Sequence, residues 1–312
     1  IFKSIDGGKN WGFASFGIKS WYGMQLATHP EDADTVFTTT SGGVYKSTNA
    51  GESWRVIGGS DLCDDEEAGG NCHYHGIIIE KKAPFKVLVG SGGDQYSKED
   101  VGLTGSEDNG ESWRNSDDGF VRDVHVSKLI IDPNNNNVFY ATTQGATEYT
   151  DKVGDGAGVF KSTDRGNNWT QINNGLDSLE TNILTVDPND SETLYLGTDD
   201  DGVYKSKDGG ESWNKLTVSS LSKSFGVGDI IVDPQNSNNV YIGTVDYFRL
   251  SESRGVLGDF GVYKSTDGGA TWEEFNVGLN HLGVFSLELS EENRILYAGT
   301  RAGGVYWISL DN

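Results

Sequence analysis

The chain has 312 residues, of which 47 are Asp or Glu and 24 are Lys or Arg, so its formal net charge at pH 7 is −23. Nucleic acid binds chains of the opposite charge, and an anionic membrane surface repels an acidic chain, so we expect no nucleic-acid partner. No apolar run approaches the ~20 residues that span a bilayer, so we expect no membrane insertion. Hydrophobic residues make up only 35% and Gly contributes 43 residues, which predicts many tight turns and small sheets and excludes a helical bundle.

An eight-residue motif, S-x-D-x-G-x-x-W, recurs six times along the chain, with Asn49 in place of Asp in the second copy. Successive copies are 43, 59, 56, 44 and 59 residues apart, so the unit is about 43 residues and the rest is insertion. The Asp or Asn side chain can accept backbone hydrogen bonds in a turn, the Gly can adopt a positive φ, and the Trp begins the next strand and buries its ring. We therefore assign a structural role to the motif residues Asp6, Trp11, Asn49, Trp54, Asp108, Trp113, Asp164, Trp169, Asp208, Trp213, Asp267 and Trp272.

Short strands are predicted on both sides of each motif. The chain opens with Ile1–Ser4 before the first copy and a strand around Gly12–Phe16 after it, and Gly43–Ser47 precedes the second copy in the same way. Two more strands, joined by a turn, precede each later copy, and the turn between them holds all five prolines: Pro30, Pro84, Pro133, Pro188 and Pro234. Four short strands per repeat of this length predict a blade of a β-propeller, an all-β fold of four-stranded antiparallel sheets.

The strand tally predicts how the propeller closes. We expect six first strands, six second strands, seven third strands and six fourth strands, with a first, second and third strand over Val284–Leu310. The simplest closure gives one domain over residues 1–312, with six blades, in which the N-terminal fourth strand completes the last blade. Ile1–Ser4 then competes with Val305–Ser309 for one place, so seven blades, one of them incomplete, is the alternative. A spare strand with an open edge also predicts self-association.

The two cysteines bracket an acidic insertion. Cys63 and Cys72 flank the stretch D-D-E-E-A-G-G-N, and a disulfide between them would hold together a loop that otherwise repels itself. A disulfide implies an oxidising environment, so the pair predicts an extracellular or cell-surface protein. A reduced pair in a cytosolic protein is the alternative.

These residues resemble the Asp-box (BNR) repeat propellers, and the resemblance covers essentially the whole chain. The chain looks like the group that contains family 74 xyloglucanases, sortilin-type receptor propellers and photosystem II assembly factors. The resemblance implies that the Asp boxes lie on the face away from the ligand, and that a ligand meets the opposite rim. Because the group mixes enzymes, receptors and scaffolds, the fold does not choose the function.

The family pattern carries over only in part to catalytic positions. Family 74 enzymes have a Thr-Asp-x-Gly-Gly segment in an early blade, and the matching stretch here, Thr39–Gly43, has Thr40 where the Asp should be. The equivalent position holds Asp199 in a later blade and Arg301 in the last one. In those enzymes the partner carboxylate comes from a second propeller, which these 312 residues do not supply. The best catalytic candidates are Asp199, Asp246 and Asp94.

Three long insertions are predicted to enter the ligand rim, over Gly93–Val101, Gly145–Gly156 and Val245–Asp259. Their mixture of carboxylates and tyrosines suits a polar ligand such as a glycan, and the alternative is that acidic loops keep a secreted protein soluble. The predicted ligand-binding residues of the rim are Trp21, Tyr22, Tyr96, Arg122, Tyr149, Tyr247, Arg249 and Arg301.

Asp-rich segments raise the question of a metal, because Ca²⁺ binds hard oxygen ligands. The candidates for a structural Ca²⁺ are Asp151, Asp155, Asp199 and Asp201, although neither segment matches an EF-hand loop. No cofactor is required by any motif in the chain.

The sequence predicts an extracellular or cell-surface propeller that acts as a binding or scaffold module for carbohydrate or protein. The alternative is a glycoside hydrolase, xyloglucanase-like or active on another polysaccharide, that uses paired carboxylates of the rim. The residues leave open whether the chain is an enzyme.

Overall fold

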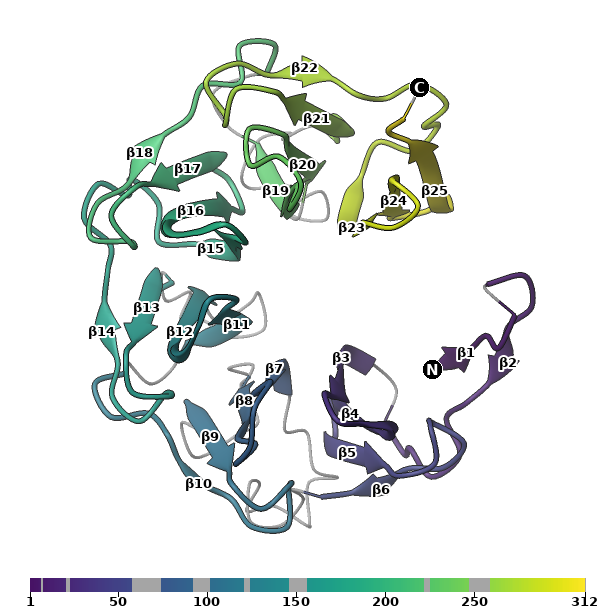
Figure 1. The fold of residues 1–312 in the computed structure, drawn as a ribbon. Coiled ribbons are helices and arrows are strands. Elements are labelled where there is room, and N and C mark those ends of the chain that lie inside the picture. The colour runs from purple at the N-terminus through teal and green to yellow at the C-terminus, as the bar shows by residue number, and fades with distance from the viewer. Residues whose placement is uncertain are drawn as a thin grey trace. The chain divides into compact units, whose positions relative to one another are not determined.

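The computed structural model describes residues 1–6, 8–20, 23–57, 74–91, 102–120, 124–145, 156–221, 225–246 and 259–311. Regular structure in these ranges consists of β-strands (Figure 1), as the composition predicts. The described part of the chain has no helix that is long and apolar enough to cross a membrane.

The strands are short, and most of them contain β-branched and aromatic residues that favour a pleated, half-buried backbone. Their bounds are β1 Phe2–Lys3, β2 Gly12–Phe13, β3 Gly23–His29, β4 Asp32–Thr40, β5 Gly43–Ser47, β6 Arg55–Val56, β7 Tyr74–Ile79, β8 Val87–Ser91, β9 Leu103–Ser106, β10 Arg114–Asn115, β11 His125–Asp132, β12 Asn135–Gln144, β13 Val159–Ser162, β14 Thr170–Gln171, β15 Thr181–Asp187, β16 Asp190–Thr198, β17 Val203–Ser206, β18 Asn214–Lys215, β19 Gly226–Val232, β20 Val240–Val245, β21 Val262–Ser265, β22 Glu273–Glu274, β23 Val284–Ser290, β24 Ile295–Thr300 and β25 Gly304–Ser309.

The strands form small sheets in chain order (Figure 1). Five sheets have four strands, namely β3-β4-β5-β6, β7-β8-β9-β10, β11-β12-β13-β14, β15-β16-β17-β18 and β19-β20-β21-β22, while β23-β24-β25 has three strands and β1-β2 has two. In the described residues this gives the predicted numbers of first, second, third and fourth strands, and all five prolines lie in the turn between first and second strands. The number of blades in the closed propeller stays a prediction.

The residues group into two compact units. The first comprises Ile1–Ile131, Asn136–Ala157 and Ser162–Thr170, and the second comprises Asp132–Asn135, Gly158–Lys161 and Gln171–Asn312. The organisation of residues 1–312 as one domain stays a prediction.

In both units, neighbouring sheets pack where a glycine of one second strand meets a side chain of the next first strand. In the second unit a Cβ on Gly197 of β16 would lie 2.7 Å from Val227 of β19, and in the first unit a Cβ on Gly90 of β8 would lie 2.6 Å from Cβ of Val126 of β11. Both valines are fully buried. A larger residue at either glycine would therefore push the sheets apart.

Each Asp box forms the hairpin that joins a third strand to a fourth. In the box between β17 and β18, the Ser206 hydroxyl donates to Asp208 Oδ1 at 2.7 Å and accepts the backbone N–H of Gly210 at 2.8 Å. Asp208 also accepts the backbone N–H of Ser212 at 2.9 Å and its hydroxyl at 2.6 Å. Gly210 has a φ of +94°, which confirms the predicted role of the motif glycine.

The motif tryptophan is anchored on the preceding box. The Nε1–H of Trp213 donates to the carbonyl of Ile172 at 2.7 Å, and its backbone N–H donates to the carbonyl of Asn174 at 2.9 Å. Gly175, with a φ of +93°, lies so close that a Cβ would overlap the carbonyl oxygen of Trp213. We call these three positions, which follow the preceding motif tryptophan by three, five and six residues, a tryptophan seat.

Within the described residues of the first unit, the complete seat is formed by Ala14, Phe16 and Gly17 for Trp54 and by Ser116, Asp118 and Gly119 for Trp169. The seated tryptophans are buried, as predicted. The prediction is wrong for Trp11, which is 63% exposed and whose Nε1–H donates to the carbonyl of Gly8 in its own box at 3.0 Å.

A lysine at the end of the third strand reaches the next box. Its Nζ donates to the backbone carbonyl of the fourth residue of that box, from Lys46 to Asn109, from Lys161 to Gly209 and from Lys205 to Gly268, at 2.9, 2.8 and 2.7 Å. Gly105 occupies the lysine position of β9, and there Lys86 supplies the ammonium instead, donating to the carbonyl of Arg165 at 2.8 Å. A Cβ on Gly105 would lie 2.7 Å from Cε of Lys86, so the two positions share one space.

The terminal strands remain short of a complete sheet. β1 pairs with β2 through Phe2 with Phe13 and Lys3 with Gly12, and β25 pairs along its length with β24. Closure of the last blade by the N-terminal strand stays a prediction.

Candidate functional site

In the second unit, the turns from second to third strands are fixed by a threonine. The hydroxyls of Thr198, Thr244 and Thr300, at or next to the ends of β16, β20 and β24, donate to the carbonyl of the glycine that precedes or begins the third strand, at 3.0, 3.0 and 2.9 Å. The residues that follow these threonines are therefore held close to the strand ends. These residues include Asp199, Asp246 and Arg301, three of the residues that the sequence places on the ligand rim.

The ends of β16 and β20 lie close together. The carbonyl oxygens of both Asp199 and Val245 lie against Gly226, the first residue of β19, where a Cβ would overlap them. Asp199 is also held by its backbone N–H, which donates to the carbonyl of Glu180 at 3.0 Å. The side chains of Asp199 and Asp246 are buried, and the two residues are 5% and 1% exposed.

Arg301 connects the end of β24 to the end of β20. Its Nη2 donates to the carbonyl of Asp246, and its Nη1 lies 4.0 Å from a carboxylate oxygen of Asp259. The other carboxylate oxygen of Asp259 accepts the backbone N–H of Asp246 at 2.9 Å. The guanidinium stacks over the ring of Phe285 at 5.3 Å, and Phe285 is 41% exposed. We call Asp199, Asp246, Asp259, Phe285 and Arg301 the strand-end cluster.

This arrangement is suited to binding. A guanidinium presents several N–H donors in one plane, and a partly exposed aromatic ring offers an apolar face, whereas the carboxylates of Asp199 and Asp246 are buried. Together these groups match the alternation of hydroxyls and apolar ring faces in a sugar. Because Asp259 and Phe285 hold Arg301 in place, the donors are oriented before a ligand arrives.

The three consecutive aspartates after β16 point to different partners. Asp200 accepts the hydroxyl of Ser178 at 2.9 Å, and Asp201 accepts the Tyr204 hydroxyl and pairs with Lys215. Burial and the neighbouring Asp201 raise the pKa of Tyr204, so its hydroxyl stays protonated and remains a donor. In the described ranges no group of three or more His, Cys, Asp or Glu side chains is placed to hold a metal ion. The calcium site stays a prediction, and Asp151 and Asp155 lie outside the described residues.

Most of the predicted rim residues lie in the parts of the chain that the structure does not describe. Arg301 is the predicted ligand-binding residue that the structure does place. Those outside the described residues are Trp21, Tyr22, Asp94, Tyr96, Arg122, Tyr149, Tyr247 and Arg249, together with both cysteines of the predicted disulfide, Cys63 and Cys72.

The strand-end cluster includes two residues that the sequence did not select as site residues. Asp259 ends the third predicted rim insertion, and Phe285 lies inside β23. A signal for Asp259 exists in its position two residues before Gly261, whose carbonyl Thr244 binds. No pattern in the sequence marks Phe285, because its partner Arg301 comes from the neighbouring strand's far end.

Comparisons with known proteins agree with the Asp-box geometry. The profile of the family described as "Sortilin, neurotensin receptor 3" (Sortilin-Vps10) matches residues 157–305. A xyloglucanase from a Paenibacillus species is 29% identical over 251 residues, which cover 77% of this chain and 20% of the xyloglucanase.

Solved structures show the same fold. An ancestral GH74 enzyme superposes with a TM-score of 0.71 at 19% identity, covering 93% of this chain and 39% of the enzyme. PorZ, described as an essential bacterial surface component of the type-IX secretion system of Porphyromonas gingivalis, superposes with a TM-score of 0.64 at 17% identity, covering 90% of this chain and 38% of PorZ.

The chain thus spans about a fifth of the length of the Paenibacillus xyloglucanase and less than half of either solved structure. Its Asp boxes, its four-stranded antiparallel sheets and these likenesses agree with one another. The chain is an all-β propeller with Asp-box repeats, of the kind found in family 74 xyloglucanases and sortilin-type proteins.

Proposed function

We propose that this chain is a non-catalytic binding module, outside the cell or on its surface, that recognises carbohydrate through the strand-end cluster and the loops of the rim. A protein ligand at the same rim is the other class that the sequence predicts. The proposal rests on one observation above all, which is the orientation of Arg301 by Asp259 and Phe285 at the ends of β20 and β24.

The burial of the candidate catalytic carboxylates supports binding over hydrolysis. A glycoside hydrolase needs one carboxyl group that reaches the glycosidic oxygen and a second at a defined distance across the sugar. Asp199 and Asp246 are almost completely buried, and their backbone N–H groups donate to the carbonyl of Glu180 and to the carboxylate of Asp259, respectively. Buried in this way, the two side chains are poorly placed to give a proton to a bound polysaccharide.

The similar proteins support a carbohydrate as the ligand and the outside of the cell as the location. A xyloglucanase is among the similar proteins, which favours a β-glucan or xyloglucan as the first ligand to test. A bacterial surface component is among the similar structures, which favours the extracellular or surface setting that the cysteine pair predicts. The excess of acidic residues favours a neutral polysaccharide over an anionic one.

The experiment is a calorimetric titration of the intact chain with xyloglucan oligosaccharides. We expect binding by the wild type and a loss of at least about tenfold in affinity for Arg301→Ala, because the substitution removes the oriented donors. Arg55→Ala is the matched control. Arg55 lies in β6, which belongs to a different sheet from the strand-end cluster, and its half-exposed side chain pairs with Glu111. Equal binding by the Arg301 and Arg55 variants, or no binding by the wild type, would contradict the proposal.

A further inference from the structure

β23 contains a β-bulge at Phe285, the aromatic residue of the strand-end cluster. The strand pairs Val284 with Thr300 and Ser286 with Gly299, so Phe285 is an extra residue between two consecutive pairs. In a regular strand the side chains alternate between two faces, so residues 285 and 287 would share a face. In β23 the residue at 287 is buried and only 4% exposed, whereas Phe285 is 41% exposed. The bulge therefore turns Phe285 away from the buried face of its strand.

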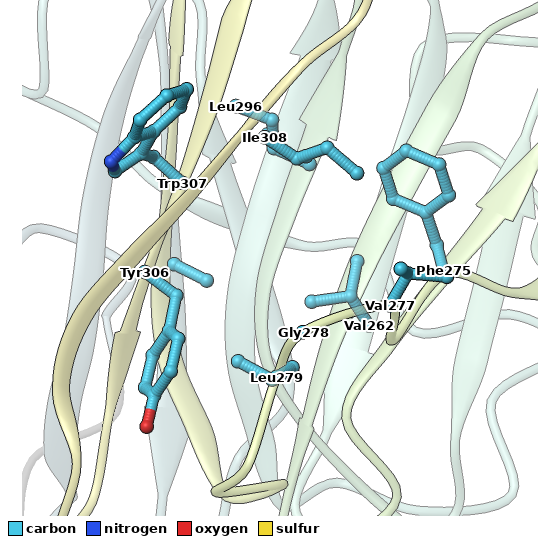
Figure 2. A pocket seen from close by; sticks show the side chains of 10 residues that line it. Val262, Phe275, Val277, Gly278, Leu279, Leu296, Tyr306, Trp307 and Ile308 are labelled. Carbon is cyan, nitrogen blue, oxygen red and sulfur yellow. The ribbon is translucent and has the colours of Figure 1, made fainter.

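The buried face of β23 belongs to an apolar core. Leu287 packs there with Val262, Leu296 and Ala298. The last three residues also line an apolar groove of about 80 Å³, and Figure 2 shows Val262 and Leu296 beside it. Within the described residues the lining of the groove does not include Phe285. The core and its groove therefore lie on one face of β23, and the ring of Phe285 is presented on another.

The carboxylate of Asp229, in the first strand of the preceding sheet, holds β23 directly after the bulge. Its Oδ2 accepts the backbone N–H of Leu287 at 2.8 Å. Its Oδ1 accepts the backbone N–H of Ile230, in its own strand, also at 2.8 Å. Because a carboxylate accepts hydrogen bonds at both oxygens, one side chain ties the two strands together at this point.

The residue before Asp229 makes room for the bulge. A Cβ on Gly228 would overlap the carbonyl oxygen of Val284 and would lie 3.1 Å from Cα of Phe285. Gly228 is itself the bulge residue of β19, since it lies between the paired residues Val227 and Asp229. The bulge of β23 thus lies directly against the bulge of β19, with the carboxylate of Asp229 next to both.

The first unit contains the same arrangement. In β7 the bulge residue is His75, and the side-chain Oε1 of Gln25, in β3, accepts the backbone N–H of Ile77 at 3.1 Å. Ile77 follows the bulge residue by two positions, as Leu287 follows Phe285. In both units, a polar side chain of one first strand therefore holds the next first strand just after a bulge that carries a ring.

β15 shows the arrangement without the acceptor. Ile183 stands where Asp229 and Gln25 stand in their strands, directly after the bulge residue. The following strand, β19, still forms its bulge, but the bulge residue is Gly228, which has no side chain to place. In these described strands the bulge forms with or without the acceptor, and the acceptor accompanies a ring. This comparison indicates that the acceptor serves the side chain at the bulge.

We propose that Asp229 is the positioning residue of the strand-end cluster, which fixes the bulge of β23 and so presents the ring of Phe285 to a bound sugar. The guanidinium carbon of Arg301 lies 5.3 Å from the centre of that ring, and the backbone N–H of Arg301 donates to the carbonyl of Gly283, just before the bulge, at 2.8 Å. The inference rests on the binding role proposed for the cluster. It adds that Asp229 acts through Phe285, by setting the ring in place before a ligand arrives.

The test uses two substitutions at Asp229 for which the chain itself gives precedents. Asp229→Ile removes the acceptor and introduces the residue type that β15 has at this position. Asp229→Gln keeps an acceptor without the charge, as Gln25 does in β3. Thr185→Val is the matched control, because the hydroxyl of Thr185 donates to the carbonyl of Ile230 at 2.7 Å and so joins two first strands without involving β23.

The first measurement reads the position of Phe285 without any ligand, by fluorine NMR of the intact chain labelled with 4-fluorophenylalanine. The resonance that is missing from Phe285→Leu belongs to Phe285. We expect Asp229→Ile to shift or broaden this resonance, and Asp229→Gln and Thr185→Val to leave it in place. An unchanged resonance in Asp229→Ile, or an equal shift in Thr185→Val, would overturn the inference.

The second measurement is calorimetry with xyloglucan oligosaccharides. Asp229→Ile should weaken binding about fivefold or more, and Asp229→Gln should bind nearly as the wild type does. In the Phe285→Leu background Asp229→Ile should cause no further loss, because its effect passes through the ring. A further loss of the same size would overturn the inference. If the wild type binds none of the oligosaccharides, the proposed function fails instead, and the fluorine spectra still decide whether Asp229 places the ring.

Discussion

At the scale of single residues, the Asp box is a set of charged hydrogen-bond acceptors that are exposed to water and yet tightly bound. The hydroxyl and backbone N–H of Ser112 lower the pKa of Asp108 to about 2, and Ser212 and Ser206 do the same for Asp208. The second box shows that a neutral side chain can hold the same turn. There Asn49 accepts the N–H of Ser53 at 2.9 Å and donates its amide to the Ser53 hydroxyl at 2.9 Å.

The lowered pKa values predict how stability depends on acid. The folded-state pKa of about 2 lies below the ordinary value of 3.8, so the unfolded chain takes up protons first as the pH falls. The stabilisation from these boxes is complete above about pH 4 and is lost as the pH falls toward 2.

We expect the double substitution Asp108→Asn with Asp208→Asn to flatten the decline in unfolding free energy over this range, measured by urea unfolding at a series of pH values. Asn49→Asp serves as the control, since it adds one carboxylate in the same turn and should make the decline steeper. Equal slopes in all three proteins would show that the box hydrogen bonds do not set the acid sensitivity.

At the scale of elements, three kinds of contact recur between neighbouring sheets in the described part of the chain. A glycine of the second strand admits a valine of the following sheet, a tryptophan occupies the seat of the preceding box, and a lysine of the third strand reaches the following box. Burial lowers the pKa of Lys205, which is the cost of placing this ammonium between two sheets. The hydrogen bond to Gly268 offsets that cost.

In the sheet of β9, Lys86 supplies the ammonium that a third-strand lysine supplies elsewhere, and Gly105 stands at the third-strand position. Moving the lysine from position 86 to position 105 therefore tests whether the two positions serve the same contact. Lys86→Ala should lower the unfolding free energy by about 2 kcal/mol, because the carbonyl of Arg165 loses a charged donor. Gly105→Lys in the wild type should also destabilise, since Cε of Lys86 already fills the space that its side chain needs. In the Lys86→Ala background, Gly105→Lys should instead restore part of the lost stability, as measured by urea unfolding. Additive losses in the double variant would refute the shared role of the two positions.

The sequence predicts the strands, turns and boxes, but it does not predict the contacts between one repeat and the next. The strands, the proline turns and the boxes repeat along the chain, so local pattern is sufficient to place them. The lysine contact was visible as the repeated lysine of segments such as Gly202–Ser206, but its acceptor lies in the following repeat, beyond the reach of a local pattern.

At the scale of the whole molecule, the repeats are sufficient to predict the fold, but they do not predict the function. Repetition places each of the six boxes between a third and a fourth strand, while the rim depends on insertions that do not repeat and whose residues follow no shared pattern. Of the predicted rim residues, Arg301, Asp199 and Asp246 could be found because they directly follow the regular second strands. Phe285 could not, because its role arises only when β23 and the end of β24 come together.

Our central claim is that the chain binds a polysaccharide without cleaving it. The most direct test is to measure the new reducing ends that the intact chain releases from xyloglucan, under conditions in which calorimetry shows binding. A module that binds without cleaving should release none above the level of buffer alone, in the wild type and in Asp199→Asn alike. Sustained release by the wild type that disappears in Asp199→Asn would contradict the claim and identify the rim as a hydrolase site.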